Sequence, residues 1–80
     1  MAAHCTVHSM IGILHTKVGV PLDTPNIATA SWEEIGVESL GLTEICTSLG
    51  HQLGIYIPHE EALITKNVQD LVTFVNTIEA

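Results

Sequence analysis

Apolar residues recur three and four positions apart in three stretches of the chain, a spacing that places them on one face of a helix. The first stretch predicts a helix over roughly residues 5–18, and Gly19 can end it in a left-handed conformation. The second predicts a helix from Ser39 to about Leu53, with Gly54 in the same terminating role. The apolar positions of these two helices are Val7, Met10, Ile11, Leu14 and Val18, followed by Leu42, Ile45, Cys46, Leu49 and Leu53.

The third apolar stretch predicts a last helix near the C-terminal end. Asn67, with Asp70 three positions later, has the pattern of a residue that caps a first turn. Residues 59–64 can add one short acidic helical turn after Pro58, whereas residues 55–58 alternate like a strand but include this proline and have no partner strand. The sequence therefore predicts an all-α fold, a small four-helix bundle of three main helices and one short helix. The apolar face of the last helix comprises Val68, Leu71, Val72, Val75 and Ile78.

A long loop separates the first two predicted helices. Residues 19–38 are rich in proline, asparagine, aspartate and small side chains, which argues against a regular element. A loop of this length inside a small domain is usually anchored or functional. Trp32 and Ile35 are the apolar side chains that we expect to anchor it on the core.

The length and composition are those of one small folded domain covering residues 1–80. Apolar residues make up 46% of the chain and the mean hydropathy is +0.39, which argues against a disordered polypeptide. The longest apolar runs, such as residues 10–14, are too short to span a membrane, and the N-terminus lacks the basic residues of a secretory signal. Two cysteines, Cys5 and Cys46, make no disulfide framework, so a reduced, cytoplasmic protein is expected.

Negative charge is concentrated in the second part of the chain. Nine acidic residues face only two cations, Lys17 and Lys66, which gives a formal net charge of −7. Lys17 and Asp23 cancel in residues 1–30, so the whole excess lies in residues 31–80. The lack of a basic surface argues against nucleic acid and anionic membranes as partners. The charge favours basic protein partners, although solubility alone is an alternative reason for it.

Ser39 stands at the junction between the long polar loop and the second predicted helix. A serine at this position can cap the helix. It can also be an exposed attachment point, because the positive end of a helix dipole favours a covalently bound phosphate. The sequence around Ser39 has no Gly-x-Ser-x-Gly elbow and no acid–histidine pair, so no self-activated nucleophile is predicted.

Several short motifs in residues 32–78 resemble those of the acyl carrier protein family. Residues 36–40, Gly-Val-Glu-Ser-Leu, resemble its Gly-x-Asp-Ser-Leu signature, with glutamate in place of aspartate. Several motifs at a consistent spacing are a stronger signal than any one of them. The other matching positions are the Trp-Glu-Glu-Ile-Gly approach at 32–36, Glu44, the Ile-Pro segment at 54–58, the acidic turn at 60–62 and the last helix start at 67–71.

The resemblance implies a non-catalytic carrier that holds acyl groups as thioesters for enzymes of fatty acid, polyketide or hybrid biosynthesis. A phosphopantetheinyl transferase would attach 4′-phosphopantetheine to Ser39 from coenzyme A, and Val37 favours an acyl carrier over a peptidyl carrier. The other implied partners are acyl-loading and acyl-processing enzymes with basic docking surfaces. The initiating methionine favours a freestanding protein, and a monomer is expected. The residues implied to face the partners are Glu38, Leu40, Glu44, Ile57, Glu60 and Glu61.

Two features depart from the usual docking surface of that family. Residues 50–52 are Gly-His-Gln where many members have glutamates, and Thr43 and Thr47 stand where the second helix is often apolar. The far half of the expected docking surface is therefore less acidic and more polar. This difference bears on the choice of partner enzymes more than on the carrier role.

Histidines on the first predicted helix provide the alternative interpretation. His4, His8 and His15 fall within about 40° of one another at ~100° per residue, and Cys5 is adjacent to the first of them. The sequence fixes no third ligand, so a solvated edge is the simpler interpretation and no metal site is predicted. The alternative function is an unmodified helical protein-interaction or metal-responsive module. The aromatic residues expected in the core or at its rim are Trp32, Tyr56 and Phe74.

Overall fold

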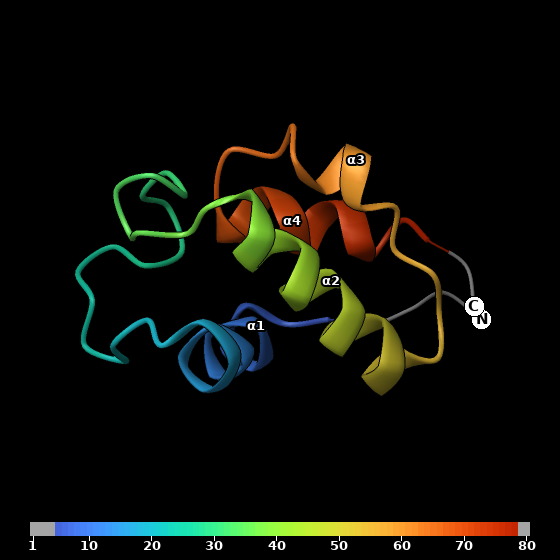
Figure 1. Ribbon diagram of the computed structural model, residues 1–80, viewed down its shortest axis with the longest axis horizontal. Coiled ribbons are helices and arrows are strands. Elements are labelled where there is room, and N and C mark those ends of the chain that lie inside the picture. Colours follow the sequence, from blue (N-terminus) through green and yellow to red (C-terminus); the bar gives the residue numbers. More distant parts are fainter. Residues whose placement is uncertain (1–4, 79–80) are drawn as a thin grey trace.

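The computed structural model describes residues 5–78 and shows an all-α fold (Figure 1). Helix α1 spans Val7–Ile13 and continues into the π-helical segment η1, Leu14–Val18. The later helices are α2, Ser39–Leu53, α3, His59–Ala62, and α4, Val68–Val75. The described part of the chain contains no strand, so the prediction of three main helices and one short helix is confirmed. None of its helices is long and apolar enough to cross a membrane.

Helix α1 begins later than predicted because Thr6 and Ser9 form a capping box. The Thr6 hydroxyl accepts from the backbone N–H of Ser9, and the Ser9 hydroxyl accepts from that of Thr6. Cys5 precedes this cap, is buried, and is held by the side-chain amide of Asn76. The Cys5 N–H donates to Asn76 Oδ1 (2.6 Å), and Asn76 Nδ2 donates to the Cys5 carbonyl (2.8 Å). These two bonds join the start of α1 to the end of α4.

The predicted ends of the helices are confirmed at two glycines. Gly19 follows η1 with φ of 81°, and Gly54 follows α2 with φ of 68°. Both lie in the left-handed region, which a glycine adopts without steric cost. The predicted cap at Asn67 is also present, because its side-chain oxygen accepts from the backbone N–H of Asp70 (2.8 Å).

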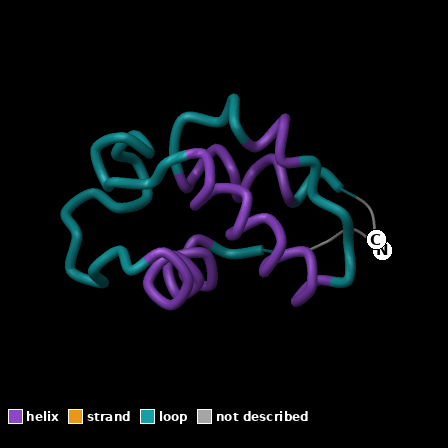
Figure 2. Tube along the Cα trace, in the orientation of Figure 1, coloured by secondary structure: helices purple, strands orange, loops and turns teal. Residues whose placement is uncertain are grey.

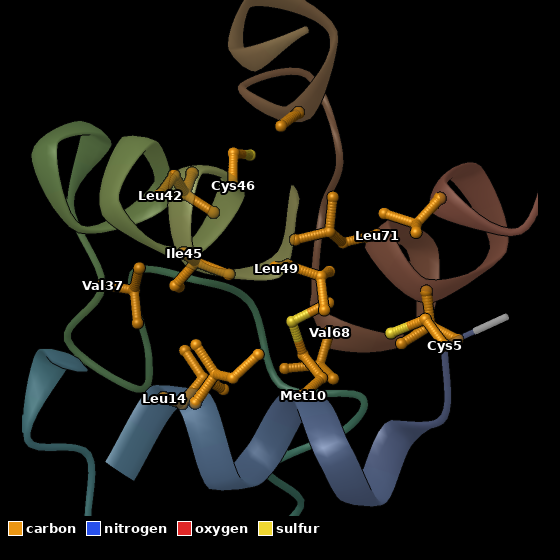
Figure 3. Close-up of a cluster of buried hydrophobic side chains, with 14 of the residues drawn as sticks. Cys5, Met10, Leu14, Val37, Leu42, Ile45, Cys46, Leu49, Val68 and Leu71 are labelled. Carbon is orange, nitrogen blue, oxygen red and sulfur yellow. The ribbon is translucent and has the colours of Figure 1, made fainter. Parts of the chain in front are cut away.

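A single hydrophobic core holds the helices together (Figure 3). Helix α1 packs against both α2 and α4, while α3 packs against α2. Burial of apolar surface is the main favourable term in folding, so the buried face of each helix fixes its position. The most deeply buried side chains are Met10, Leu14, Ile45, Leu49, Val68, Leu71 and Val75.

The connection over residues 19–38 runs as a loop around one end of the bundle (Figure 2). Trp32 is buried, its indole N–H donates to Thr65 Oγ1 (3.1 Å), and its backbone N–H donates to the Lys66 carbonyl (3.2 Å). Ile35 is partly buried and packs against the core. The anchoring predicted for Trp32 and Ile35 is therefore confirmed, and the loop is also tied to the segment between α3 and α4.

The segment between α2 and α3 corrects one expectation. Ile57 is buried and Ile55 packs against the core, whereas Tyr56 between them is 77% exposed. Successive side chains of an extended segment point to opposite sides, so Tyr56 faces outward. The prediction that Tyr56 lies in the core or at its rim is wrong. Phe74 is partly buried against the core, as expected.

Candidate functional site

Ser39 is the first residue of α2, and Glu38 before it is the N-cap, with extended backbone angles of −98° and 176°. The alternative that Ser39 is only the cap of α2 does not hold, because a capping residue must precede the first helical residue. Ser39 is exposed, and its hydroxyl makes no hydrogen bond to the residues that the structure describes. Its Oγ is therefore free to take part in chemistry supplied from outside the chain.

The chain before Ser39 is held by a short set of backbone contacts. Gly36 adopts φ of 80°, and its N–H donates to the Glu33 carbonyl (3.1 Å). Val37 is buried, and its N–H donates to the Trp32 carbonyl (2.8 Å). Val37 and Trp32 both belong to the core. The chain that enters α2 is therefore anchored just before Ser39, and the body of α2 holds it just after.

Ser31 and Glu34 form a turn just before Gly36 in the chain. The Ser31 N–H donates to Glu34 Oε1 (3.0 Å), and the Glu34 N–H donates to Ser31 Oγ (3.2 Å). The bond from the Ser31 N–H, and to a lesser extent the bond with the Ser31 side chain, holds the pKa of the Glu34 carboxyl below its ordinary value. Glu34 is therefore an ionised residue whose two bonds to Ser31 order the turn before Gly36.

The hydroxyls of two threonines on α2 bond to the backbone of their own helix. Thr43 Oγ1 donates to the Ser39 carbonyl (3.1 Å), and Thr47 Oγ1 donates to the Thr43 carbonyl (3.0 Å). Each bond is of the kind that serine and threonine make inside helices. Both side chains are exposed, so α2 presents a polar, hydrogen-bonded strip beyond Ser39.

Five of the six residues implied to face partners are exposed. Leu40 is 83% exposed and lies one helical turn before Glu44, so the two share a face of α2. The sixth residue, Ile57, is only 5% exposed and lines a hollow between α2 and the segment before α3, where it can shape the rim that a partner meets. Among the exposed acids, Glu38 precedes α2 and Glu44 lies in its second turn. Glu60 and Glu61 lie on α3, which packs against α2.

Two hollows open on the surface beside α2. The smaller one, about 320 Å³, contains Ser39 and is also lined by Trp32, Leu63 and Lys66. The larger one, about 550 Å³, lies between the middle of α2 and the segment before α3. Gly50 shapes the larger hollow, because a Cβ placed there would lie 2.7 Å from the Ile55 carbonyl oxygen. Neither sequence pattern nor spacing predicts the hollow at Ser39, since Lys66 and Leu63 reach it only through the fold.

The cysteines are buried thiols with no disulfide between them. Burial raises the pKa of both Cys5 and Cys46, because the thiolate is less well solvated inside the protein. Cys46 also lines the larger hollow. Both side chains are therefore neutral thiols at pH 7 and poor nucleophiles.

The histidine stripe does not assemble into a site within the described residues. His4 lies outside residues 5–78, so its place relative to the others is not described. His8 and His15 are exposed, and His15 Nδ1 lies 3.0 Å from the Val20 carbonyl oxygen, which occupies that ring nitrogen. Residues 5–78 contain no group of three histidine, cysteine or acidic side chains placed to hold a metal ion.

Comparison with known proteins identifies the family. A sequence model of the family described as "Phosphopantetheine attachment site" matches residues 9–75. Three similar solved structures are forms of the acyl carrier protein of actinorhodin synthesis in Streptomyces coelicolor: 3-oxo-butyl, 3,5-dioxohexyl and holo, with TM-scores of 0.79, 0.80 and 0.77. Each is 25% identical to this chain, and the match covers 96% of this chain and 93% of the other.

The geometry at the start of α2 fits the group that this family carries. A covalent phosphodiester needs an accessible hydroxyl on a rigid element, and Ser39 offers one that no neighbouring group occupies. The phosphate would lie at the positive end of a helix of 15 residues. The chain belongs to the phosphopantetheine attachment site family: it is a carrier domain of the acyl carrier protein type, and its covalent prosthetic group is 4′-phosphopantetheine.

Proposed function

We propose that this chain carries acyl intermediates of polyketide or fatty acid biosynthesis on a phosphopantetheine arm attached to Ser39. The observation that carries the proposal is the free, exposed Ser39 hydroxyl at the first position of α2, within a segment that matches the attachment family. Carrier domains of this family are generally non-catalytic. The arm supplies the thiol that holds the acyl group as a thioester.

Loading of the carrier is a phosphoryl transfer from coenzyme A. The Ser39 Oγ–phosphorus bond forms, the bond between the two phosphates of coenzyme A breaks, and adenosine 3′,5′-bisphosphate leaves. The Ser39 proton passes to a base of the transferase or to water. The chain's own contribution is position: the anchored loop and α2 hold the serine at the surface, so the transferase meets a pre-ordered hydroxyl.

The exposed acids beside Ser39 support docking by basic partners. Glu38 and Glu44 flank the serine on α2, and Glu60 and Glu61 lie on the adjacent short helix. Leu40, also exposed, lies one helical turn before Glu44 and adds an apolar contact beside these charges. Electrostatic attraction mainly raises association rates and leaves complexes short-lived, which suits a carrier that visits several enzymes.

The larger hollow supports polyketide over fatty acid cargo. Its lining includes polar or ionisable side chains from Thr47, His51, Tyr56 and His59 beside apolar Ile55. An acyl chain bearing ketone or hydroxyl oxygens can accept hydrogen bonds from His51, Tyr56 or His59 there, which a saturated chain cannot do. The similar solved structures come from a polyketide synthase, which agrees with this choice.

Intact-mass spectrometry after incubation with coenzyme A and a promiscuous phosphopantetheinyl transferase tests the proposal. The wild-type mass should rise by one phosphopantetheinyl unit, and Ser39→Ala should abolish the gain. Ser48→Ala, a serine on the same helix away from the start, is the matched control and should gain the full unit. Modification of the Ser39→Ala variant, or none of the wild type, would overturn the proposal.

A further inference from the structure

Lys66 is the feature of the Ser39 hollow that the carrier role does not explain. It is one of only two lysines in a chain with nine acidic residues, and it lines the same hollow as Ser39. The other lysine, Lys17, lies in η1 and is not part of this lining. A cation at this place in a strongly acidic protein works against attraction of basic partners.

The backbone of Lys66 is fixed at both of its polar groups. Its carbonyl accepts from the N–H of Trp32 (3.2 Å), and its own N–H donates to Asp70 Oδ2 (3.2 Å). Trp32 is buried, lines the hollow as well, and donates from its indole to Thr65. The Lys66 side chain therefore starts from an ordered point at the edge of the hollow.

The ammonium group of Lys66 has no partner among the residues that the structure describes. All of its hydrogen bonds within residues 5–78 run through the backbone, and Asp70, the nearest acid in sequence, already accepts from the Lys66 N–H. The side chain is exposed, so binding an external anion would break no existing contact. A lysine is a common point charge for phosphate in proteins.

We propose that Lys66 pairs with the phosphodiester of the group carried on Ser39 and so directs the root of the arm over Leu63. The proposal rests on attachment at Ser39. The phosphodiester would be bonded directly to Ser39 Oγ and carry one negative charge, which places an anion on a residue that lines the same hollow as Lys66. Lys66 is thus a positioning residue: it sets the direction in which the arm leaves α2, towards the segment between α3 and α4.

The test compares four holo proteins by ³¹P NMR and thermal unfolding: wild type, Lys66→Gln, Lys66→Arg and Lys17→Gln. The two Gln variants make the same change in net charge, so Lys17→Gln controls for it. Mass spectrometry first shows that each protein is modified. Relative to wild type, the ³¹P resonance of the phosphodiester should move in Lys66→Gln towards its position in the urea-unfolded holo protein, and it should stay at the wild-type position in Lys66→Arg and Lys17→Gln.

Thermal unfolding gives the second readout. The difference in Tm between holo and apo forms should be lower in Lys66→Gln than in wild type by about 1–8 °C, the range for an exposed ion pair in a domain of this size. The ³¹P difference should shrink in 1 M salt, where the Debye length falls to about 3 Å. Full modification with an unchanged ³¹P resonance and an unchanged Tm difference in Lys66→Gln would overturn the role of Lys66 and leave Ser39 intact. Absence of modification in wild type would overturn both.

Discussion

Two kinds of helix start occur in this small protein. Helices α1 and α4 begin with side-chain caps, made by Thr6 with Ser9 and by Asn67 with Asp70. The longest helix, α2, begins without one, because Glu38 occupies the N-cap position and makes no capping bond. Ser39, the proposed attachment site, therefore lies at the one main helix start that lacks a side-chain cap within the described residues.

The difference separates structural from functional use of a helix N-terminus. At α1 and α4 a side chain satisfies backbone N–H groups, which stabilises the helix. At α2 the first-turn N–H groups and the Ser39 hydroxyl are left to solvent and to whatever binds there. The position of α2 must then come from its buried face, where Ile45 and Leu49 are almost fully enclosed.

The largest expected effect is from removing that buried face. Ile45→Ala should lower the free energy of unfolding by about 2–5 kcal/mol, because Ile45 is 0% exposed and its loss leaves a cavity. Leu40→Ala, on the exposed side of the same helix, should change it by less than about 0.5 kcal/mol. Urea denaturation measures both. Equal losses would show that α2 is not held by its inner face.

The next largest effect on the free energy of unfolding is expected from removing a helix cap. Asn67→Ala should cost about 1 kcal/mol, the usual value for a lost N-cap, whereas Ser39→Ala should cost less than about 0.5 kcal/mol. Asn67→Asp is the control: it keeps the capping oxygen but loses the bond that Asn67 Nδ2 donates to the Thr29 carbonyl. Urea denaturation again decides. A loss for Ser39→Ala equal to that of Asn67→Ala would mean that Ser39 stabilises α2 after all.

Much of the fold could be predicted from the sequence, because it depends on local patterns, whereas the missing side-chain cap at α2 could not. Periodic apolar residues locate the helices, Gly19 and Gly54 end them, and Asn67 caps the last one. The motif around Ser39 predicts attachment there, which remains a prediction until the modification is measured. These features depend on neighbours within one or two turns.

What could not be predicted depends on contacts between distant parts of the chain. Cys5 meets Asn76 only because α1 packs against α4. Lys66 reaches the Ser39 hollow only because Trp32 ties the long loop to the segment before α4. The outward turn of Tyr56 depends on which side of an extended segment meets the core. Apolar periodicity carries no information on such pairings.

A smaller effect is expected on docking at the exposed side of α2. Glu44→Lys should slow transferase modification of Ser39 by roughly 2–5-fold near 0.1 M salt, and less at 1 M, because the Debye length falls from ~10 Å to ~3 Å. Asp23→Lys makes the same charge change on the long loop and should have little effect. Glu79, the natural tail control, lies outside the described residues.

Leu40→Ala should slow modification with little salt dependence, because its contact is apolar. Equal rates for the two Lys variants would show that the acidic surface serves solubility alone.

The smallest effect sharpens the comparison at the start of α2 itself. Glu38→Asp should raise the free energy of unfolding by about 0.5 kcal/mol, because the shorter carboxylate can accept from the N–H groups of the first turn and aspartate is a favoured N-cap. The extended backbone at Glu38 already suits a cap, so no rearrangement is needed. Glu33→Asp, the same change in the exposed turn before α2, is the matched control and should leave stability unchanged.

Since Ser39 makes no cap bond, Glu38→Asp should also leave the Ser39 hydroxyl free, and the rate of modification should stay within twofold of wild type. A gain in stability accompanied by loss of modification would show instead that the missing cap is required for access to Ser39.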